Sequence, residues 1–248
     1  ILYCVCLWAE KFFHQFSIIL LRNLGDFPIL LGNYTVAMQC LAVLLIVPFA
    51  LTQNFLPDLS YAYRHGQVDK VFPVALKLMT LVVTVLAILA VAYGSVCMTI
   101  VFGKEYGDAP IIFRMLGLVY VPYVLNIFTL RSLTVLDARK SAAGVWGGML
   151  VLHGLGMQMG FANYQLYAVV GSMFIASIIG VIVSMVIVTR RLGIASHQWW
   201  LKLMLTAASG LFLIYWEPLP GFLMAPLALL VVIIVGLLFQ IFEPGEFN

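Results

Sequence analysis

Four charged side chains stand inside long apolar stretches of the sequence: Glu10, Lys11, Lys77 and Arg131. An ionisable group at the centre of a bilayer costs at least ~2.5 kcal/mol, so charges in such stretches are functional candidates. If these side chains line one water-filled cavity, that cavity has a cationic character. It would then suit an anionic cargo, such as a phosphate or pyrophosphate headgroup. We therefore predict a substrate-binding site at these four residues.

The same residues also have a structural interpretation. Lys77 and Arg131 lie within a turn or two of predicted helix ends, where long side chains extend their charges to the lipid headgroups. Glu10 and Lys11 can satisfy one another or a neighbouring helix. His153 stands alone among Gly and Met, which favours a hydrogen-bonded interior histidine. For the cations, two interpretations remain: they bind substrate, or they extend their charges to the lipid headgroups.

The composition identifies the surroundings of these charges. The chain has 248 residues, of which 64% are hydrophobic and only 9% are charged, whereas soluble domains have roughly 25% charged residues. Such a chain cannot cover a water-facing surface, and its apolar runs match the ~20 residues that cross a bilayer. We predict an all-α, polytopic helical membrane protein. The net charge of +3 is scattered over short loops, so it does not indicate a nucleic-acid partner.

The cysteines do not indicate a metal site. All four lie in apolar runs without a CxxC spacing, which favours buried small hydrophobic side chains over metal ligands or disulfides. They are Cys4, Cys6, Cys40 and Cys97. We therefore expect neither a metal nor a cofactor.

Short polar stretches divide the chain into eight predicted transmembrane segments. They cover residues 1–21, 34–57, 73–102, 109–134, 140–161, 166–189, 199–216 and 220–242. The connections are short, and no soluble domain is expected. The first apolar segment includes Ile1 itself, as if its helix had begun before this residue. We therefore expect the chain to be a piece of a longer protein.

Basic residues in the loops predict the orientation, because cytoplasmic loops carry an excess of Lys and Arg. Six of them follow the second, fourth and sixth segments: Arg64, Lys70, Arg139, Lys140, Arg190 and Arg191. The opposite loops carry only Arg22 and Lys104. The first group is therefore expected in the cytoplasm, together with the C-terminus.

Small residues at a spacing of four predict close helix packing, since they let two backbones approach in lipid. Three sets of this kind occur in the fifth and sixth segments. They are Gly144 with Gly148, Gly156 with Gly160, and the row Ser172, Ala176, Gly180 and Ser184.

Several motifs together resemble a known family. The segment "GNYTVAMQCLAVLLIVPFALTQNFLPDLS" resembles the part of polysaccharide flippases in which a Gly-x-Tyr-x-x-Ala start leads through a mid-helix Pro to an "FP-LS" exit. "VFGKEYGDA" and "LWAEKFF" are similar to two further elements, with Glu10 in place of the usual Asp. The ordered set covers residues 8–193. It resembles the polysaccharide-transporter branch of the multidrug/oligosaccharidyl-lipid/polysaccharide exporter superfamily.

This resemblance implies half of a fourteen-helix transporter that is not an enzyme. Residues 1–193 would form the C-terminal six-helix lobe and residues 194–248 the two extra helices, with the N-terminal lobe as a partner. The implied substrate is a polyprenyl-pyrophosphate-linked oligosaccharide, moved across the bacterial inner membrane for polysaccharide biosynthesis, as in lipopolysaccharide or exopolysaccharide export. The connection between the first two segments is longer and more apolar here than in the family pattern.

Two prolines are candidate hinges for such a transporter: Pro48 and Pro57. Pro48 cannot donate a hydrogen bond to the Leu44 carbonyl, so the helix is expected to bend there. The freed carbonyl needs a partner, which water in a cavity can supply. A static kink for packing is the alternative.

Two other functional classes stay in play. A drug/cation antiporter of the same superfamily would favour carboxylates inside the lobe, where only Glu10 lies deep in a segment. A polytopic glycosyltransferase or ligase generally presents its catalytic groups on a sizeable external loop, whereas the loops here are short.

Overall fold

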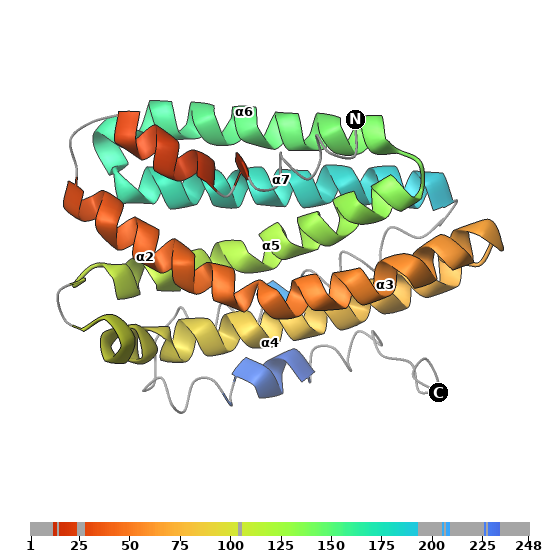
Figure 1. Ribbon diagram of the computed structural model, residues 1–248, viewed down its shortest axis with the longest axis horizontal. Helices are drawn as coiled ribbons and strands as arrows, with labels where there is room; N and C mark the ends of the chain where they lie inside the picture. The colour runs from red at the N-terminus through yellow and green to blue at the C-terminus, as the bar shows by residue number, and fades with distance from the viewer. Residues whose placement is uncertain are drawn as a thin grey trace.

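The structure is a computed structural model that describes residues 12–13, 15–23, 28–103, 106–192, 205, 207–208, 226 and 228–233. These residues form helices and short connections, and no strand occurs among them. The helices are α2 (Pro28–Leu44), α3 (Ile46–Arg64), α4 (Val68–Phe102), α5 (Ala109–Val135), α6 (Arg139–Tyr164) and α7 (Leu166–Leu192). The predicted all-α class is confirmed (Figure 1).

Four stretches within the described residues are long and apolar enough to span a membrane. They are Pro28–Arg64, Val68–Phe102, Ala109–Val135 and Leu166–Leu192. The predicted count of eight is not confirmed. Much of the segment 1–21 and most of 199–216 and 220–242 lie outside the described residues.

The second predicted segment, 34–57, is wrong at both ends. The helical stretch runs from Pro28 to Arg64, with a single turn residue, Leu45, between α2 and α3. Proline is favoured in the first turn of a helix, where its missing N–H leaves no bond unmade. Only residues 24–27 therefore separate α2 from the preceding helical residues, and the connection is shorter than expected.

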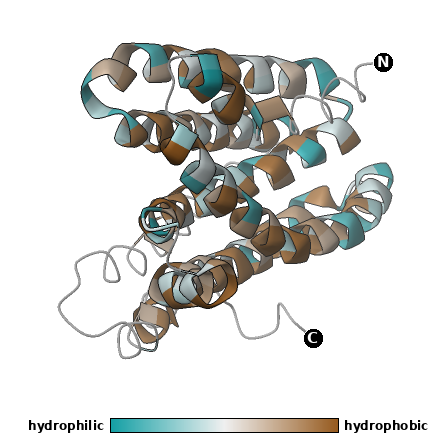
Figure 2. Ribbon diagram, turned by 60° about the vertical axis from the view of Figure 1, so that its left-hand side comes forward, coloured by the Kyte–Doolittle hydropathy of each residue, from teal (hydrophilic) through white to brown (hydrophobic). Residues whose placement is uncertain are grey.

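Helix α5 is the centre of the bundle. It contacts α2, α3, α4, α6 and α7, and 19 of its 27 residues are buried, so neighbours cover it on every side. Figure 1 shows α5 between the α6–α7 pair and the helices α2, α3 and α4. Figure 2 shows apolar ribbon along most of the helix lengths, with hydrophilic residues gathered near several helix ends. This distribution suits a bundle whose middle lies in hydrocarbon.

Glycines set the closest helix contacts, and they confirm part of the small-residue prediction. A Cβ atom at Gly156 would lie 2.6 Å from the Ser172 Cβ, and one at Gly160 would lie 2.9 Å from the Ala168 Cβ. The backbones of α6 and α7 are therefore in close contact near Gln165, where the two helices are connected. The prediction for Gly144 and Gly148 is not confirmed among the described residues, of which none places an atom within 4 Å of a Cβ at either glycine.

Buried hydroxyls join the helices where the small residues let them approach. The Ser184 and Thr129 hydroxyl oxygens lie 2.8 Å apart and link α7 to α5. The Asn126 amide donates to the Met149 sulfur at 2.8 Å and links α5 to α6. Hydrogen bonds of this kind hold helices together in lipid, where no hydrophobic force drives their association.

Candidate functional site

Lys77 and Arg131 are the two predicted cations that the structure describes, and both are partly buried. They lie on α4 and α5, which are antiparallel. The contacts of Val91 with Gly117 and of Phe72 with Phe128 fix the register of this pair. These two contacts place Lys77 level with the part of α5 between about residues 123 and 131. Glu10 and Lys11 lie outside the described residues.

Arg131 contacts the helix that carries the first predicted hinge. Its guanidinium carbon lies 5.0 Å from the centroid of the Phe49 ring, within the range of a cation–π interaction. Phe49 directly follows Pro48 in the chain. The cation on α5 is therefore held beside the bend between α2 and α3.

The bend itself has a specific hydrogen-bond partner. Pro48 has no N–H for the Leu44 carbonyl, and the Tyr120 hydroxyl donates to that carbonyl at 2.7 Å. Tyr120 is fully buried. The sequence pointed to water as the partner, whereas the structure supplies a side chain from α5. Figure 1 shows α2 and α3 meeting at an angle at this point.

The second predicted hinge does not interrupt the helix. Helix α3 continues through Pro57 to Arg64. At the start of α3, the Thr52 hydroxyl donates to the Pro48 carbonyl at 2.7 Å, a bond from a side chain to its own helix that often accompanies bending. Movement at Pro48 and Pro57 stays a prediction.

The residues that follow Lys77 at helical spacing on α4 form a row of polar and small side chains, and this row is mainly a packing surface. Thr80, Thr84, Ala87 and Val91 are buried, and the Thr80 hydroxyl donates to the carbonyl of Leu76 in its own helix at 2.8 Å. Lys77, at the start of this row, is only partly buried. That Lys77 and Arg131 bind substrate stays a prediction.

His153 is a hydrogen-bonded interior histidine, as predicted. Its Nε2 atom lies 2.7 Å from the Ser17 hydroxyl and its Nδ1 atom 2.8 Å from the Ser172 hydroxyl. Because Ser172 donates its proton to the Val169 carbonyl, we assign the ring proton to Nδ1, which leaves Nε2 to accept from Ser17. The Phe13 ring lies 5.5 Å from the imidazole, centroid to centroid. His153 thereby ties the helical residues 15–23 to α6 and α7.

Sequence reasoning missed two residues of this site, Tyr120 and Phe49. Pro48 identified Leu44 as a carbonyl without its helical donor, since the two residues are four apart. No pattern in the sequence identified the donor, because Tyr120 follows Leu44 by 76 residues.

Together, these features define a polytopic membrane protein built as a helical bundle around α5. Its fold is similar to that of a solved structure titled "Lipid II flippase MurJ, inward closed conformation", with a TM-score of 0.70 and 14% sequence identity. The match covers 94% of this chain and 52% of that chain, so the chain spans about half the length of the flippase. No protein-family model and no curated protein matches the sequence.

Proposed function

We propose that this chain forms one lobe of a flippase that moves a polyprenyl-pyrophosphate-linked oligosaccharide across the bacterial inner membrane. The observation that carries the proposal is the fold shared with about half of a lipid II flippase. The sequence resemblance to polysaccharide transporters supports the same class of substrate. The lobe would work with an N-terminal lobe of the same transporter, and residues 194–248 would add two helices to it.

In this proposal the two cations receive the headgroup of the substrate. A pyrophosphate carries charge that hydrocarbon does not solvate, and fixed cations in a cavity offset that cost. Lys77 and Arg131 lie on neighbouring helices, and Arg131 lies beside the bend at Pro48. A change in the bend would therefore change the position of one headgroup ligand.

Complementation of a bacterial strain that lacks its polysaccharide flippase tests the function. We expect the full-length parent protein to restore glycan export, and residues 1–248 alone not to restore it, because one lobe cannot enclose the cavity. Surface glycan is measured by antibody labelling, and membrane fractions confirm equal amounts of both proteins. Rescue by residues 1–248 would contradict the half-transporter proposal. Failure of the full-length protein in strains with several different glycans would contradict the flippase proposal.

The proposed orientation places the loops around residues 64–70 and 137–140 in the cytoplasm, and it places the connection between α4 and α5 outside. In a background without other cysteines, a cysteine at position 66 or 140, both of which are exposed, should be protected from a membrane-impermeant maleimide in intact cells. A cysteine at position 107 should react, and all three should react after the membrane is permeabilised. The reverse pattern would show that the orientation is wrong.

A further inference from the structure

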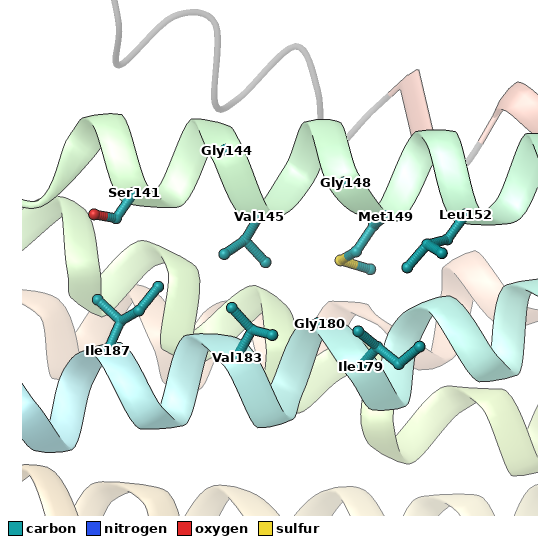
Figure 3. Close-up of a pocket in the computed structure, with 10 residues that line it drawn as sticks. All are labelled: Ser141, Gly144, Val145, Gly148, Met149, Leu152, Ile179, Gly180, Val183 and Ile187. Carbon is teal, nitrogen blue, oxygen red and sulfur yellow. The ribbon is translucent and has the colours of Figure 1, made fainter.

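A groove of about 340 Å³ lies between α6 and α7, on a face of the bundle that the predicted headgroup site does not use. Figure 3 shows its walls. They include Gly144, Val145 and Gly148 on α6, and Ile179, Val183 and Ile187 on α7. The lining is almost entirely apolar. Within the part of the chain that the structure describes, no atom lies within 4 Å of a Cβ placed at Gly144 or Gly148.

The groove lies next to the closest contacts between α6 and α7. The two helices touch where Gly156 faces Ser172, and Gly180 packs beneath the Met149 side chain. Beyond that point toward the start of α6, glycines face the gap in place of larger side chains. The sequence predicted tight packing at Gly144 and Gly148, whereas the structure shows that their small size opens a groove.

Four cations lie at the helix ends next to Ser141 and Ile187, at one end of the groove. The antiparallel register set by Gly156 and Ser172 places the start of α6 level with the end of α7. Helix α6 begins with Arg139 and Lys140, and α7 ends with Arg190, Arg191 and Leu192. Three of these cations are exposed at this end of the bundle and form no salt bridge with the other described residues: Lys140, Arg190 and Arg191. Arg139 lies 3.7 Å from the Asp137 carboxylate, which offsets its charge.

The length of the groove favours one kind of occupant. It runs along α6 from Ser141 to Leu152, which is roughly 16 Å at 1.5 Å per residue. That length is about half of the ~30 Å hydrocarbon core of a bilayer, the depth of one leaflet. An acyl chain of a glycerophospholipid has this reach, whereas a polyprenyl chain is much longer than one leaflet is deep.

We propose that the groove binds an anionic glycerophospholipid from the leaflet at the basic end of the bundle. One acyl chain lies along Gly144 and Gly148, and the phosphate lies among Lys140, Arg190 and Arg191. Each cation near an anionic lipid surface contributes roughly fivefold to binding, by conversion of about 1 kcal/mol. The proposal is independent of the transported substrate, because none of its residues belongs to the predicted headgroup site.

Lipid titration of the purified full-length chain in detergent tests this site, with native mass spectrometry as the readout. The probes are phosphatidylglycerol and phosphatidylcholine with identical acyl chains. We expect phosphatidylglycerol to bind at least tenfold more tightly. The double variant Arg190→Gln/Arg191→Gln should lose most of that preference, and Gly144→Leu/Gly148→Leu should lower the affinity for both lipids at least tenfold.

Matched controls come from the same elements. Gly147 is exposed on α6 and has open space around it, but it does not line the groove, so Gly147→Leu should bind like the parent. Arg64→Gln/Lys70→Gln removes two cations from the end of α3 and the start of α4 and should leave the preference intact. If either control weakens binding as much as its partner variant, the groove is not the site and the proposal is wrong.

Three further results would overturn the proposal. Equal affinity for the two phospholipids would remove the role of the cations. Binding of glycerol phosphate as tight as that of phosphatidylglycerol would remove the role of the groove. Displacement of phosphatidylglycerol by an equimolar polyprenyl phosphate would assign the groove to the lipid carrier. A phosphatidylglycerol with a photoreactive acyl chain tests the unaltered protein, and label on peptides other than 141–152 and 179–187 would also overturn the proposal.

Discussion

Replacing Arg131 with alanine in the full-length protein is expected to lower glycan export roughly ten- to a hundredfold, because a hydrogen bond to a charged group contributes about 1.5–3 kcal/mol. Lys77→Ala should have a similar effect. Both side chains are only partly buried, so the variants should keep normal expression and membrane insertion. Export is measured as surface glycan per cell, normalised to the amount of transporter in the membrane.

The Phe49 ring provides the control that separates substrate binding from packing. If Arg131 acts only through its contact with Phe49, Phe49→Leu should lower export as much as Arg131→Ala. If Arg131 binds the headgroup, Phe49→Leu should lower export much less than Arg131→Ala does. Arg131→Lys keeps the charge but not the planar fork, so failure of this variant would show that two-point hydrogen bonding is required.

A second control lies on the same helix. Arg114 is 17 residues before Arg131 on α5, which is roughly 25 Å along the axis. Arg114→Ala should therefore change export little. Normal export by both Lys77→Ala and Arg131→Ala would show that these side chains only reach for the lipid headgroups.

Tyr120→Phe is expected to destabilise the protein by about 1–2 kcal/mol, because it removes the donor to the Leu44 carbonyl inside the bundle. For a chain of this size the loss corresponds to a fall of roughly 2–8 °C in Tm. If the hydroxyl replaces the missing N–H of Pro48, the effects of substitutions at Tyr120 and Pro48 on stability should be coupled. Pro48→Ala restores a backbone N–H four residues after Leu44. Tyr120→Phe should therefore destabilise the protein markedly less in a Pro48→Ala background.

Thermal unfolding of the four proteins of this cycle, in one detergent, measures the coupling. Tyr164→Phe serves as the matched change, since Tyr164 is 65% exposed at the end of α6 and should lose almost nothing. An equal cost of Tyr120→Phe with and without Pro48 would show that the hydroxyl does not substitute for the missing N–H. Export by Pro48→Ala then distinguishes a hinge from a static kink, because only a hinge requires the proline for transport.

Much of the bundle could be predicted because its helices are separated by short polar connections. Helices α4 to α7 agree with the predicted segments to within about a turn, since Gly103, Asp137 and Gln165 stand between long apolar runs. The end of α3 could not be predicted in this way. The predicted segment ended at residue 57, after the polar residues 52–54, yet the helix continues to Arg64. Polar residues alone do not end a helix whose backbone must stay hydrogen-bonded.

The site was less predictable, because its contacts join residues far apart in the chain. The spacing of Gly144 with Gly148 is the same as that of Gly156 with Gly160, but only the second pair touches α7. Periodicity identifies residues on one face of a helix and does not identify what that face meets. For the same reason Arg131 could be named as a candidate from its charge, whereas its contact with Phe49 required the fold.

The bond between Tyr120 and Leu44 has a consequence for the order of events during synthesis. The two residues are 76 positions apart, and ribosomes add roughly 5–20 residues per second, so the donor is made some 4–15 s after the acceptor. During that interval α2 and α3 have been synthesised with a carbonyl that lacks both its helical N–H and its tyrosine. Hydrocarbon does not tolerate such a group without a partner. The nascent bend must therefore stay near water or the insertion machinery until α5 arrives, which makes the entry of α5 the step that commits the first helices to the membrane.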